Sequence, residues 1–173
     1  ALNTARILNQ LEPKTADVLC PVGKNNSKNF LKLAKKDSLK IFPLYIPGNN
    51  RSCWTLLSSN GSTTEIVCDE PLLQFKNNFP VSIENKLISK LKHIVKKYDA
   101  VILSGSAQKF FSNDICSRIC TTVKNRGVLL LADFRGIQLQ NTISTTKPDF
   151  IKINEAEFRE TFFPNNASSA LFP

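Results

Sequence analysis

The 173 residues are enough for one domain with a hydrophobic core, and the hydrophobic content of 42% is that of an ordinary globular protein. Every apolar run falls short of the roughly 20 residues that a membrane-spanning helix needs, and the N-terminus lacks a signal-peptide pattern, so we expect a cytoplasmic protein with no membrane partner. The net charge of +9 comes from scattered lysines without the aromatic-interleaved basic runs typical of nucleic-acid binding, and an anionic small substrate accounts for the charge at least as well.

The five cysteines and the single histidine do not form the paired clusters that are typical of zinc sites. Cys116 and Cys120 share a predicted helix face with Ile119 and Val123, which indicates small core residues. His93 falls on a lysine-rich stripe of a predicted helix, so we expect it on a solvated face. The sequence therefore predicts reduced thiols and no nucleophile–His–Asp arrangement.

In the first part of the chain, apolar spacing predicts helices over residues 2–11 and 27–36, with a short strand over 16–23 between them. Three strand-like runs follow, at residues 39–47, 52–59 and 63–70. The last two are separated by Asn-Gly, which is a strong hairpin signal. We expect the three runs to form an antiparallel element or lid.

After Pro80 the pattern alternates between helix and strand. A helix with Ser82 as its N-cap is followed by a strand ending in Ser-Gly-Ser, a helix over 110–125, and the continuous apolar strand of GVLLLADFRG. A short helix and the segment KPDFIKINEAEF, residues 147–158, complete the series. Helices that alternate with fully apolar strands predict an α/β fold with a parallel sheet covered on both faces.

Ligands of parallel α/β sheets bind beyond the carboxyl ends of the strands, and three such ends carry polar residues here. The first is the turn Ser104-Gly105-Ser106, whose hydroxyl and N–H groups are suited to an anion. The second has Asp133 and Arg135, which would also fit a structural ion pair. The third has Lys152, Asn154, Glu155 and Glu157. Asn154 would also fit a helix cap, and Glu155 or Glu157 would complement the helix dipole, but neither role explains Lys152. Neither a P-loop nor a GxGxxG motif occurs.

The segment from Tyr98 to Phe158 resembles the PfkB, or ribokinase-like, sugar kinases, especially the branch of 1-phosphofructokinases, minor 6-phosphofructokinases and tagatose-6-phosphate kinases. That branch has an apolar strand ending in SGS, then G-V-x-x-x-x-D, then KPDxIKPNxxEF/L. This sequence has the SGS turn, Gly127-Val128 with Asp133, and KPDFIKINEAEF, in which Ile153 replaces the proline of the family.

The resemblance extends towards the N-terminus. ALNTARILNQL is similar to the helix that follows the GGKG turn of the family, and NNRSCWTLL is similar to the lid strand TRxNxxxx. Asn50 and Cys53 depart from that lid pattern, and SGSAQKFF lacks the prolines of the usual SGSLPPG. The resemblance covers essentially the whole chain but only the first half to two-thirds of the family fold. Since the sequence also begins with Ala1 and has no methionine, we expect the polypeptide to be longer at both ends.

The resemblance implies a ribokinase-like three-layer α/β fold with a central, mostly parallel sheet and a small β lid. The kinase core would comprise residues 1–36 and 69–173, and the lid would comprise residues 37–68. It also implies a homodimer through the lid. The GAGD turn, which supplies the catalytic aspartate of the family, does not occur in these residues.

The implied activity is transfer of the γ-phosphate of ATP to a sugar phosphate of the fructose 1-phosphate, fructose 6-phosphate or tagatose 6-phosphate type, with Mg²⁺ as cofactor. By the same resemblance, Asn3 would bind sugar hydroxyls, and the substrate phosphate would be bound by Arg51, Ser104, Gly105 and Ser106. The nucleotide would be bound by Lys152, Asn154 and Glu157, and the last two would also order the magnesium ion, partly through water. Two alternatives remain: a kinase of an unphosphorylated sugar or nucleoside, and a non-catalytic PfkB-like fragment.

Overall fold

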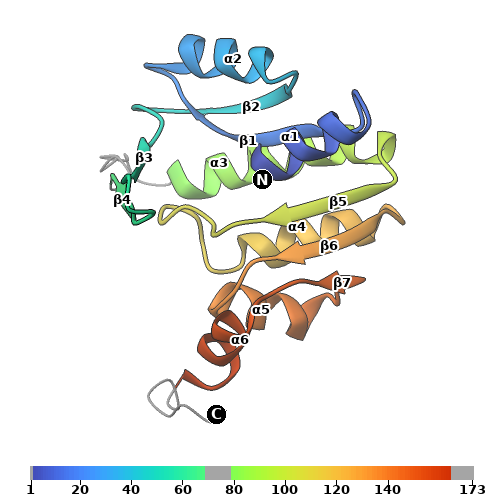
Figure 1. Ribbon diagram of the computed structural model, residues 1–173. Coiled ribbons are helices and arrows are strands. Elements are labelled where there is room, and N and C mark those ends of the chain that lie inside the picture. The colour runs from blue at the N-terminus through green and yellow to red at the C-terminus, as the bar shows by residue number, and fades with distance from the viewer. Residues whose placement is uncertain (1, 69–78, 165–173) are drawn as a thin grey trace. The chain divides into compact units, whose positions relative to one another are not determined.

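The computed structural model describes residues 2–68 and 79–164 (Figure 1). The chain divides into two units, Leu2–Asn77 and Asn78–Pro173, and each is described by itself. No helix in the described ranges is long and apolar enough to cross a membrane. The boundary that the sequence predicts at residue 69, between lid and core, lies outside the described residues.

The first unit begins as a helix–strand–helix–strand series that matches the predicted elements closely. Its elements are α1 (Leu2–Leu11), β1 (Asp17–Gly23), α2 (Ser27–Lys36) and β2 (Lys40–Ile46). Ala5, Val18, Ala34 and Leu39 form a buried cluster where these helices pack on the strands. Asn9 joins α1 to the start of β1, because its side chain donates to the carbonyl of Ala16 and accepts from the Ala16 N–H.

The predicted grouping of the three strand-like runs is wrong for the first of them. β2 pairs in parallel with β1 over seven residues, from Asp17 opposite Lys40 to Gly23 opposite Ile46. The helix α2 provides the crossover that a parallel pair requires. This pairing also buries Leu44 and Ile46, whereas all five residues of β3 (Cys53–Leu57) are exposed.

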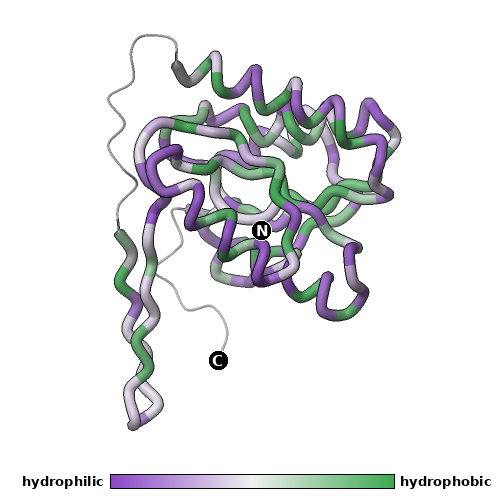
Figure 2. Tube along the Cα trace, turned by 90° about the horizontal axis from the view of Figure 1, so that it is seen from above, coloured by the Kyte–Doolittle hydropathy of each residue, from purple (hydrophilic) through white to green (hydrophobic). Residues whose placement is uncertain are grey.

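The other two runs form the expected hairpin. β3 pairs antiparallel with β4 (Thr63–Val67), and the turn contains the predicted Asn-Gly pair at residues 60–61. Figure 2 shows hydrophobic stretches along this hairpin, and Leu56, Leu57 and Ile66 are among its exposed apolar residues. Its role as a lid stays a prediction.

The second unit contains the predicted parallel sheet. Its elements are α3 (Phe79–Ile94), the 3₁₀ turn Val95–Lys97, β5 (Ala100–Ser104), α4 (Ile115–Lys124), β6 (Leu129–Asp133), α5 (Ile137–Thr145), β7 (Phe150–Ile151) and α6 (Glu155–Phe162). The strands lie side by side in the order β5-β6-β7, all parallel (Figure 1). The predicted α/β class is therefore confirmed.

One face of β6 forms the centre of this unit. Leu130 and Ala132 are buried, and α4 packs on β6 with buried Cys120 and Val123. Leu129, on the opposite face of the same strand, is 42% exposed. Burial raises the pKa of the Cys120 thiol to about 12, as expected for a core residue rather than for a nucleophile. The prediction of core cysteines on α4 is confirmed.

Two predicted helix boundaries are wrong. The helix α3 begins at Phe79, so Ser82 lies inside it and is not its N-cap; Pro80 is tolerated in the first turn, where its missing N–H has no intrahelical acceptor to lose. The helix α4 begins at Ile115 rather than at residue 110. The chain before it is held as a loop, because the Ser112 N–H donates to the buried Glu84 carboxylate over 2.6 Å.

Candidate functional site

The carboxyl ends of β5, β6 and β7 bring three predicted polar sites to one edge of the second unit. Ser104 ends β5 directly opposite Asp133, which ends β6. Lys152 follows β7, and its N–H donates to the carbonyl of Ala132 over 2.8 Å. The strand register therefore places the serine turn, the aspartate and the lysine next to one another, as the positions of these residues after successive strands predict.

Asp133 makes contacts with both of its neighbours at this edge. The Ser104 hydroxyl donates to Asp133 Oδ2 over 2.9 Å, and the Gly105 N–H donates to the Asp133 carbonyl over 2.9 Å. Lys152 Nζ lies 3.4 Å from the other carboxylate oxygen, Oδ1. Asp133 thus links the turn after β5 to the lysine after β7.

The alternative reading in which Asp133 pairs with Arg135 is wrong. Arg135 instead pairs with two carboxylates of α6, Glu157 at 3.3 Å and Glu160 at 3.2 Å. The reason is local: Asp133 ends its strand facing β5, whereas Arg135 lies in the loop beyond it, beside α6. That loop is also attached to α6 through Thr161, whose hydroxyl accepts from the Gly136 N–H.

The Ser104-Gly105-Ser106 turn is built in a way that leaves one end open. Gly105 has a φ of +85°, a conformation that residues with a side chain rarely adopt. Ala107 N–H donates to Gln138 Oε1 over 3.2 Å, so α5 holds the far side of the turn. Ser106 is exposed and makes no hydrogen bond with any other described residue. Its hydroxyl and N–H are available to an anion.

Asn154 and Glu157 form a capping box at the start of α6. Asn154 Oδ1 accepts from the Glu157 N–H over 2.8 Å, and Glu157 Oε2 accepts from the Asn154 N–H over 2.9 Å. Capping therefore accounts for both residues of this pair, whereas the sequence alone predicts a cap only at Asn154. Lys152 takes no part in the cap, and its side chain is 77% exposed.

The groups around this cap are suited to contact a magnesium ion through water rather than to ligate it directly. Glu157 accepts from Asn154 through Oε2 and from Arg135 through Oε1. Within the described ranges, no three His, Cys, Asp or Glu side chains lie close enough to hold a metal ion. Magnesium keeps several waters and binds phosphate oxygens. A magnesium ion carried by a nucleotide and contacted through water by Glu157 and Asn154 is compatible with these donors, whereas a dedicated protein cage is not.

In the first unit, a cluster of asparagines holds the loop that leads to Arg51. Asn50 Oδ1 accepts from the Gly23 N–H over 2.9 Å, and Asn26 Oδ1 accepts from the backbone and the side-chain amide of Asn50 over 2.8 and 2.7 Å. A Cβ on Gly23 would lie 2.4 Å from the carbonyl carbon of Asn49, so only glycine fits there. Arg51 itself is exposed and has no ion pair with a described residue.

The other predicted residue of this unit, Asn3, lies exposed on α1, and its side-chain oxygen accepts from Arg6 over 3.3 Å. Neither Asn3 nor Arg51 contacts the other through a hydrogen bond within the described part of the unit. The structure thus brings together Ser104, Lys152 and their linking Asp133 in the second unit, and it describes Asn3 and Arg51 separately in the first.

Sequence reasoning missed the residues that fix these loops: Asn26 and Asn50 in the first unit, and Gln138, Glu84 and Thr161 in the second. Gly23 at the end of β1, with Asn25 and Asn26 shortly after it, is a pattern that indicates a close approach of another backbone segment. The partners of Gln138 and Thr161 lie about 20 or more positions away in the chain, so no local pattern reveals them.

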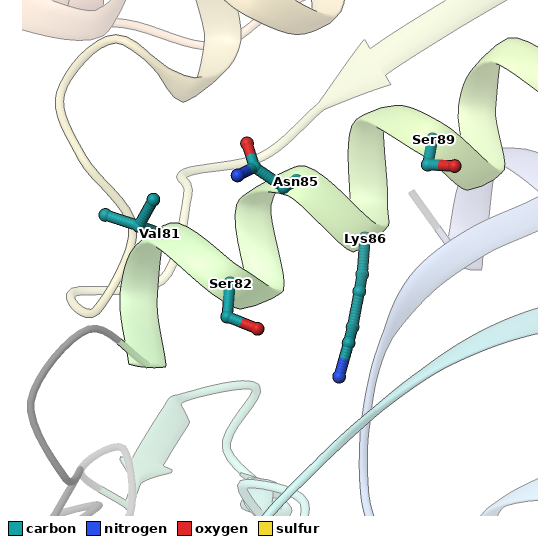
Figure 3. A pocket seen from close by; sticks show the side chains of 5 residues that line it. All are labelled: Val81, Ser82, Asn85, Lys86 and Ser89. Carbon is teal, nitrogen blue, oxygen red and sulfur yellow. The ribbon is translucent and has the colours of Figure 1, made fainter.

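A shallow hollow on α3 adds no candidate ligand site. Figure 3 shows the lining residues that belong to the described part of the chain, Val81, Ser82, Asn85, Lys86 and Ser89, which lie on α3. His93 lies one turn beyond Ser89 and is bonded to the Ser89 carbonyl. Among the described residues this lining brings no convergent groups together, and it includes none of the predicted site residues.

Known proteins are similar to this chain both in sequence and in structure. The sequence matches the family described as "pfkB family carbohydrate kinase" over residues 1–171. A tagatose-6-phosphate kinase from Staphylococcus epidermidis is 30% identical over 116 residues, which cover 66% of this chain and 35% of that protein.

Solved structures show the same fold. A possible 1-phosphofructokinase from Thermotoga maritima aligns with a TM-score of 0.77 at 19% identity, covering 88% of this chain and 47% of the other. Phosphofructokinase-2 from Escherichia coli in complex with fructose-6-phosphate aligns with a TM-score of 0.73 at 15% identity, covering 91% and 50%. The ribokinase-like fold expected from the sequence is therefore confirmed. The chain spans about half the length of these structural relatives and about a third of the curated one.

Proposed function

Because the chain belongs to the pfkB family of carbohydrate kinases, we propose that the protein transfers the γ-phosphate of ATP to a hydroxyl group of a sugar phosphate. The observation that carries the proposal is the meeting of the Ser104-Gly105-Ser106 turn with Lys152 at the carboxyl ends of three parallel strands. The turn offers the N–H and hydroxyl of the exposed Ser106, and Lys152 offers an ammonium group on a side chain that is 77% exposed and lies 3.4 Å from Asp133. Both kinds of group are suited to phosphate oxygens.

In this proposal each predicted residue has one role. Arg51, together with Ser104, Gly105 and Ser106, binds the phosphate that the sugar already carries, and Asn3 binds sugar hydroxyls. Lys152 neutralises nucleotide phosphates, while Asn154 and Glu157 contact the magnesium ion of Mg·ATP through water. The capping box supports the last role, because it fixes the Glu157 carboxylate at the N-terminus of α6.

Such residues act by positioning and by neutralising charge. Phosphoryl transfer needs little covalent chemistry from the protein, since most of the rate comes from aligning the acceptor hydroxyl with the γ-phosphate and from stabilising the charge on its oxygens. Magnesium, when bound with ATP, would be contacted through water by Asn154 and Glu157 and would offset the negative charge of the phosphates. The aspartate base that the family supplies from its GAGD turn has no counterpart in these residues, so the transfer is proposed for the protein as a whole.

For the acceptor, we propose a class of sugar phosphates rather than a single sugar. The family resemblance and the similarity to a tagatose-6-phosphate kinase support a ketohexose phosphate, of the fructose 1-phosphate, fructose 6-phosphate or tagatose 6-phosphate type. An exposed arginine at residue 51, in a loop held rigidly by Asn26 and Asn50, supports an acceptor that already carries a phosphate. The cytoplasmic location expected from the sequence stays a prediction.

We also propose that two copies of the protein pair through the β3-β4 hairpin. Trp54, Leu56, Leu57 and Ile66 are 55%, 53%, 79% and 45% exposed, and Trp54 lies directly opposite Ile66. A two-stranded hairpin has little stability alone, and clustered exposed apolar residues mark interaction surfaces. A homodimer would stabilise the hairpin and cover its exposed apolar side chains.

The substitution Arg51→Ala tests the proposed role of this residue. Loss of a charge-assisted contact to phosphate raises the KM for the sugar phosphate by about 10- to 100-fold, and it leaves the KM for ATP within a factor of about two of the wild-type value. Arg126→Ala is the matched control, because Arg126 is also an exposed arginine but lies in the turn before the amino end of β6. Equal increases in both KM values for Arg51→Ala would remove Arg51 from the acceptor site.

A further inference from the structure

One carboxylate joins the two phosphate-binding groups of the proposed site, and no role has been assigned to it. Asp133 lies at the end of β6, between Ser104 at the end of β5 and Lys152 just after β7. In the proposed function, Ser104 belongs to the turn that binds the acceptor phosphate and Lys152 belongs to the nucleotide side. Asp133 therefore lies where the two substrates have to meet.

The two carboxylate oxygens of Asp133 serve these two sides separately. Oδ2 accepts the Ser104 hydroxyl over 2.9 Å, and Oδ1 lies 3.4 Å from Lys152 Nζ. The backbone adds a second attachment to the acceptor side, because the Asp133 carbonyl accepts from the Gly105 N–H. The side chain of Asp133 is 36% exposed, so its contacts lie at the surface of the unit rather than in its core.

Lys152 depends on this contact for its direction. Its side chain is 77% exposed, and Asp133 is the carboxylate that pairs with it within the described part of the chain. A lysine side chain is a flexible four-carbon stem, so its ammonium group has no preferred direction in solvent. Asp133 draws the ammonium group towards the serine turn, whereas the backbone bond from Lys152 to Ala132 fixes only the start of the side chain.

We propose that Asp133 is a positioning residue that couples the nucleotide side of the site to the acceptor side, acting through Lys152 and Ser104. This inference rests on the proposed kinase function. The charge of Asp133 directs Lys152, and its hydrogen-bonding oxygen holds Ser104. The two effects are separable, because an asparagine at this position keeps an oxygen acceptor for the Ser104 hydroxyl and loses the negative charge.

The experiment compares Asp133→Asn and Asp133→Ala in the full-length protein, with steady-state assays of ATP and of the accepted sugar phosphate. Asp133→Asn raises the KM for ATP about two- to fivefold, the range for loss of a solvent-exposed ion pair, and leaves the KM for the sugar phosphate unchanged. Asp133→Ala raises both KM values. In a Lys152→Ala background, Asp133→Asn has no further effect on the KM for ATP, because the lysine through which it acts is already gone.

Asp149→Asn is the matched control. Asp149 also bridges a lysine and a strand, with Lys124 at 2.6 Å and the Leu130 N–H at 2.8 Å, but it lies at the amino end of β6. Its substitution lowers the thermal midpoint and leaves both KM values unchanged. A positioning role for Asp133 therefore predicts that Asp133→Asn changes the KM for ATP alone, whereas a purely structural role predicts a change in stability with both KM values unchanged.

Three results would overturn the inference. Asp133→Asn could change both KM values equally, it could lower the KM for ATP because a negative charge has been removed, or it could act additively with Lys152→Ala. Each of these, in a wild-type protein that phosphorylates a sugar phosphate, contradicts the coupling role and leaves the proposed function intact. A wild-type protein that phosphorylates no sugar phosphate overturns the proposed function, and the role of Asp133 falls with it.

Discussion

Single residues in this protein are fixed by what lies next to them in space, and Gly23 is the clearest case. It ends β1, and its N–H donates to the side chain of Asn50. Asn50 precedes Arg51, the residue proposed to bind the acceptor phosphate. The backbone of Asn49 and Asn50 lies so near that a Cβ on Gly23 would come within 2.4 and 2.5 Å of it. The position of the arginine loop therefore depends on the absence of a side chain at residue 23.

Gly23→Ala is expected to displace this loop. A methyl group that meets backbone atoms cannot be relieved by a rotamer change, so the free energy of unfolding falls by about 1–3 kcal/mol, as in overpacked cores. The KM for the sugar phosphate rises together with this loss, whereas the KM for ATP does not. Urea unfolding and steady-state kinetics measure the two effects. An alanine variant with wild-type stability would show that the loop does not lie against β1.

Other residue positions show what sequence alone can supply. The residue types at the strand ends were predictable, because SGS, Asp133 and Lys152 each follow an apolar strand. Their partners were not predictable, because the register of the strands decides that Asp133 faces Ser104, while Arg135 meets α6. Asn154 and Glu157 were expected at a helix start, and the structure joins both in one capping box.

At the scale of elements, the loop between β5 and α4 is shaped by a buried carboxylate. Glu84 on α3, whose side chain is 5% exposed, accepts from the Ser112 N–H and forms a salt bridge with Arg118 on α4. Arg118 also donates to Asn85 over 2.7 Å. These contacts join α3, α4 and the loop that carries the proposed phosphate-binding turn.

Glu84→Ala is expected to lower the free energy of unfolding by about 1–3 kcal/mol, because the Ser112 N–H and the Arg118 guanidinium lose their acceptor. Glu160→Ala is the control: Glu160 also pairs with an arginine, but its side chain is 60% exposed, so the loss stays below about 0.5 kcal/mol. Chemical unfolding of both variants gives the comparison. A larger loss for Glu160→Ala than for Glu84→Ala would contradict the ranking by burial.

The β3-β4 hairpin is the element proposed to join two copies of the protein. Replacing Trp54 and Leu57 with serine removes two of its large exposed apolar side chains, so the double variant is expected to sediment as a monomer at concentrations where the wild type is a dimer. Leu33→Ser is the control, because Leu33 is 53% exposed but lies on α2. A wild type that is monomeric at every concentration, or a dimer that survives both serine substitutions, would contradict assembly through the hairpin.

The pattern of elements was more predictable than the pairing of strands. The alternation of helices and apolar strands after residue 80 predicts the parallel order β5-β6-β7, because each strand returns through a helix. The strand β2 was assigned to the wrong partner, since its neighbours in sequence, β3 and β4, resemble it in composition. Only burial of Leu44 and Ile46 separates it from the fully exposed β3.

Over the whole molecule, family membership and the polar strand ends of the second unit support the proposed phosphoryl transfer. The match to the pfkB family covers residues 1–171, and the polar strand ends of the second unit lie where parallel α/β folds bind ligands. The central proposal for this protein is that it phosphorylates an acceptor that already carries a phosphate.

A substrate panel tests that claim most directly. The full-length protein is incubated with Mg·ATP and, in parallel, with fructose 1-phosphate, fructose 6-phosphate, tagatose 6-phosphate and the unphosphorylated sugars and nucleosides, and ADP release is measured. We predict turnover with at least one of the three sugar phosphates and none with an unphosphorylated acceptor. Turnover confined to an unphosphorylated sugar or nucleoside would reassign Arg51 and the serine turn. If none of the acceptors in the panel caused ADP release, the kinase function itself would be contradicted.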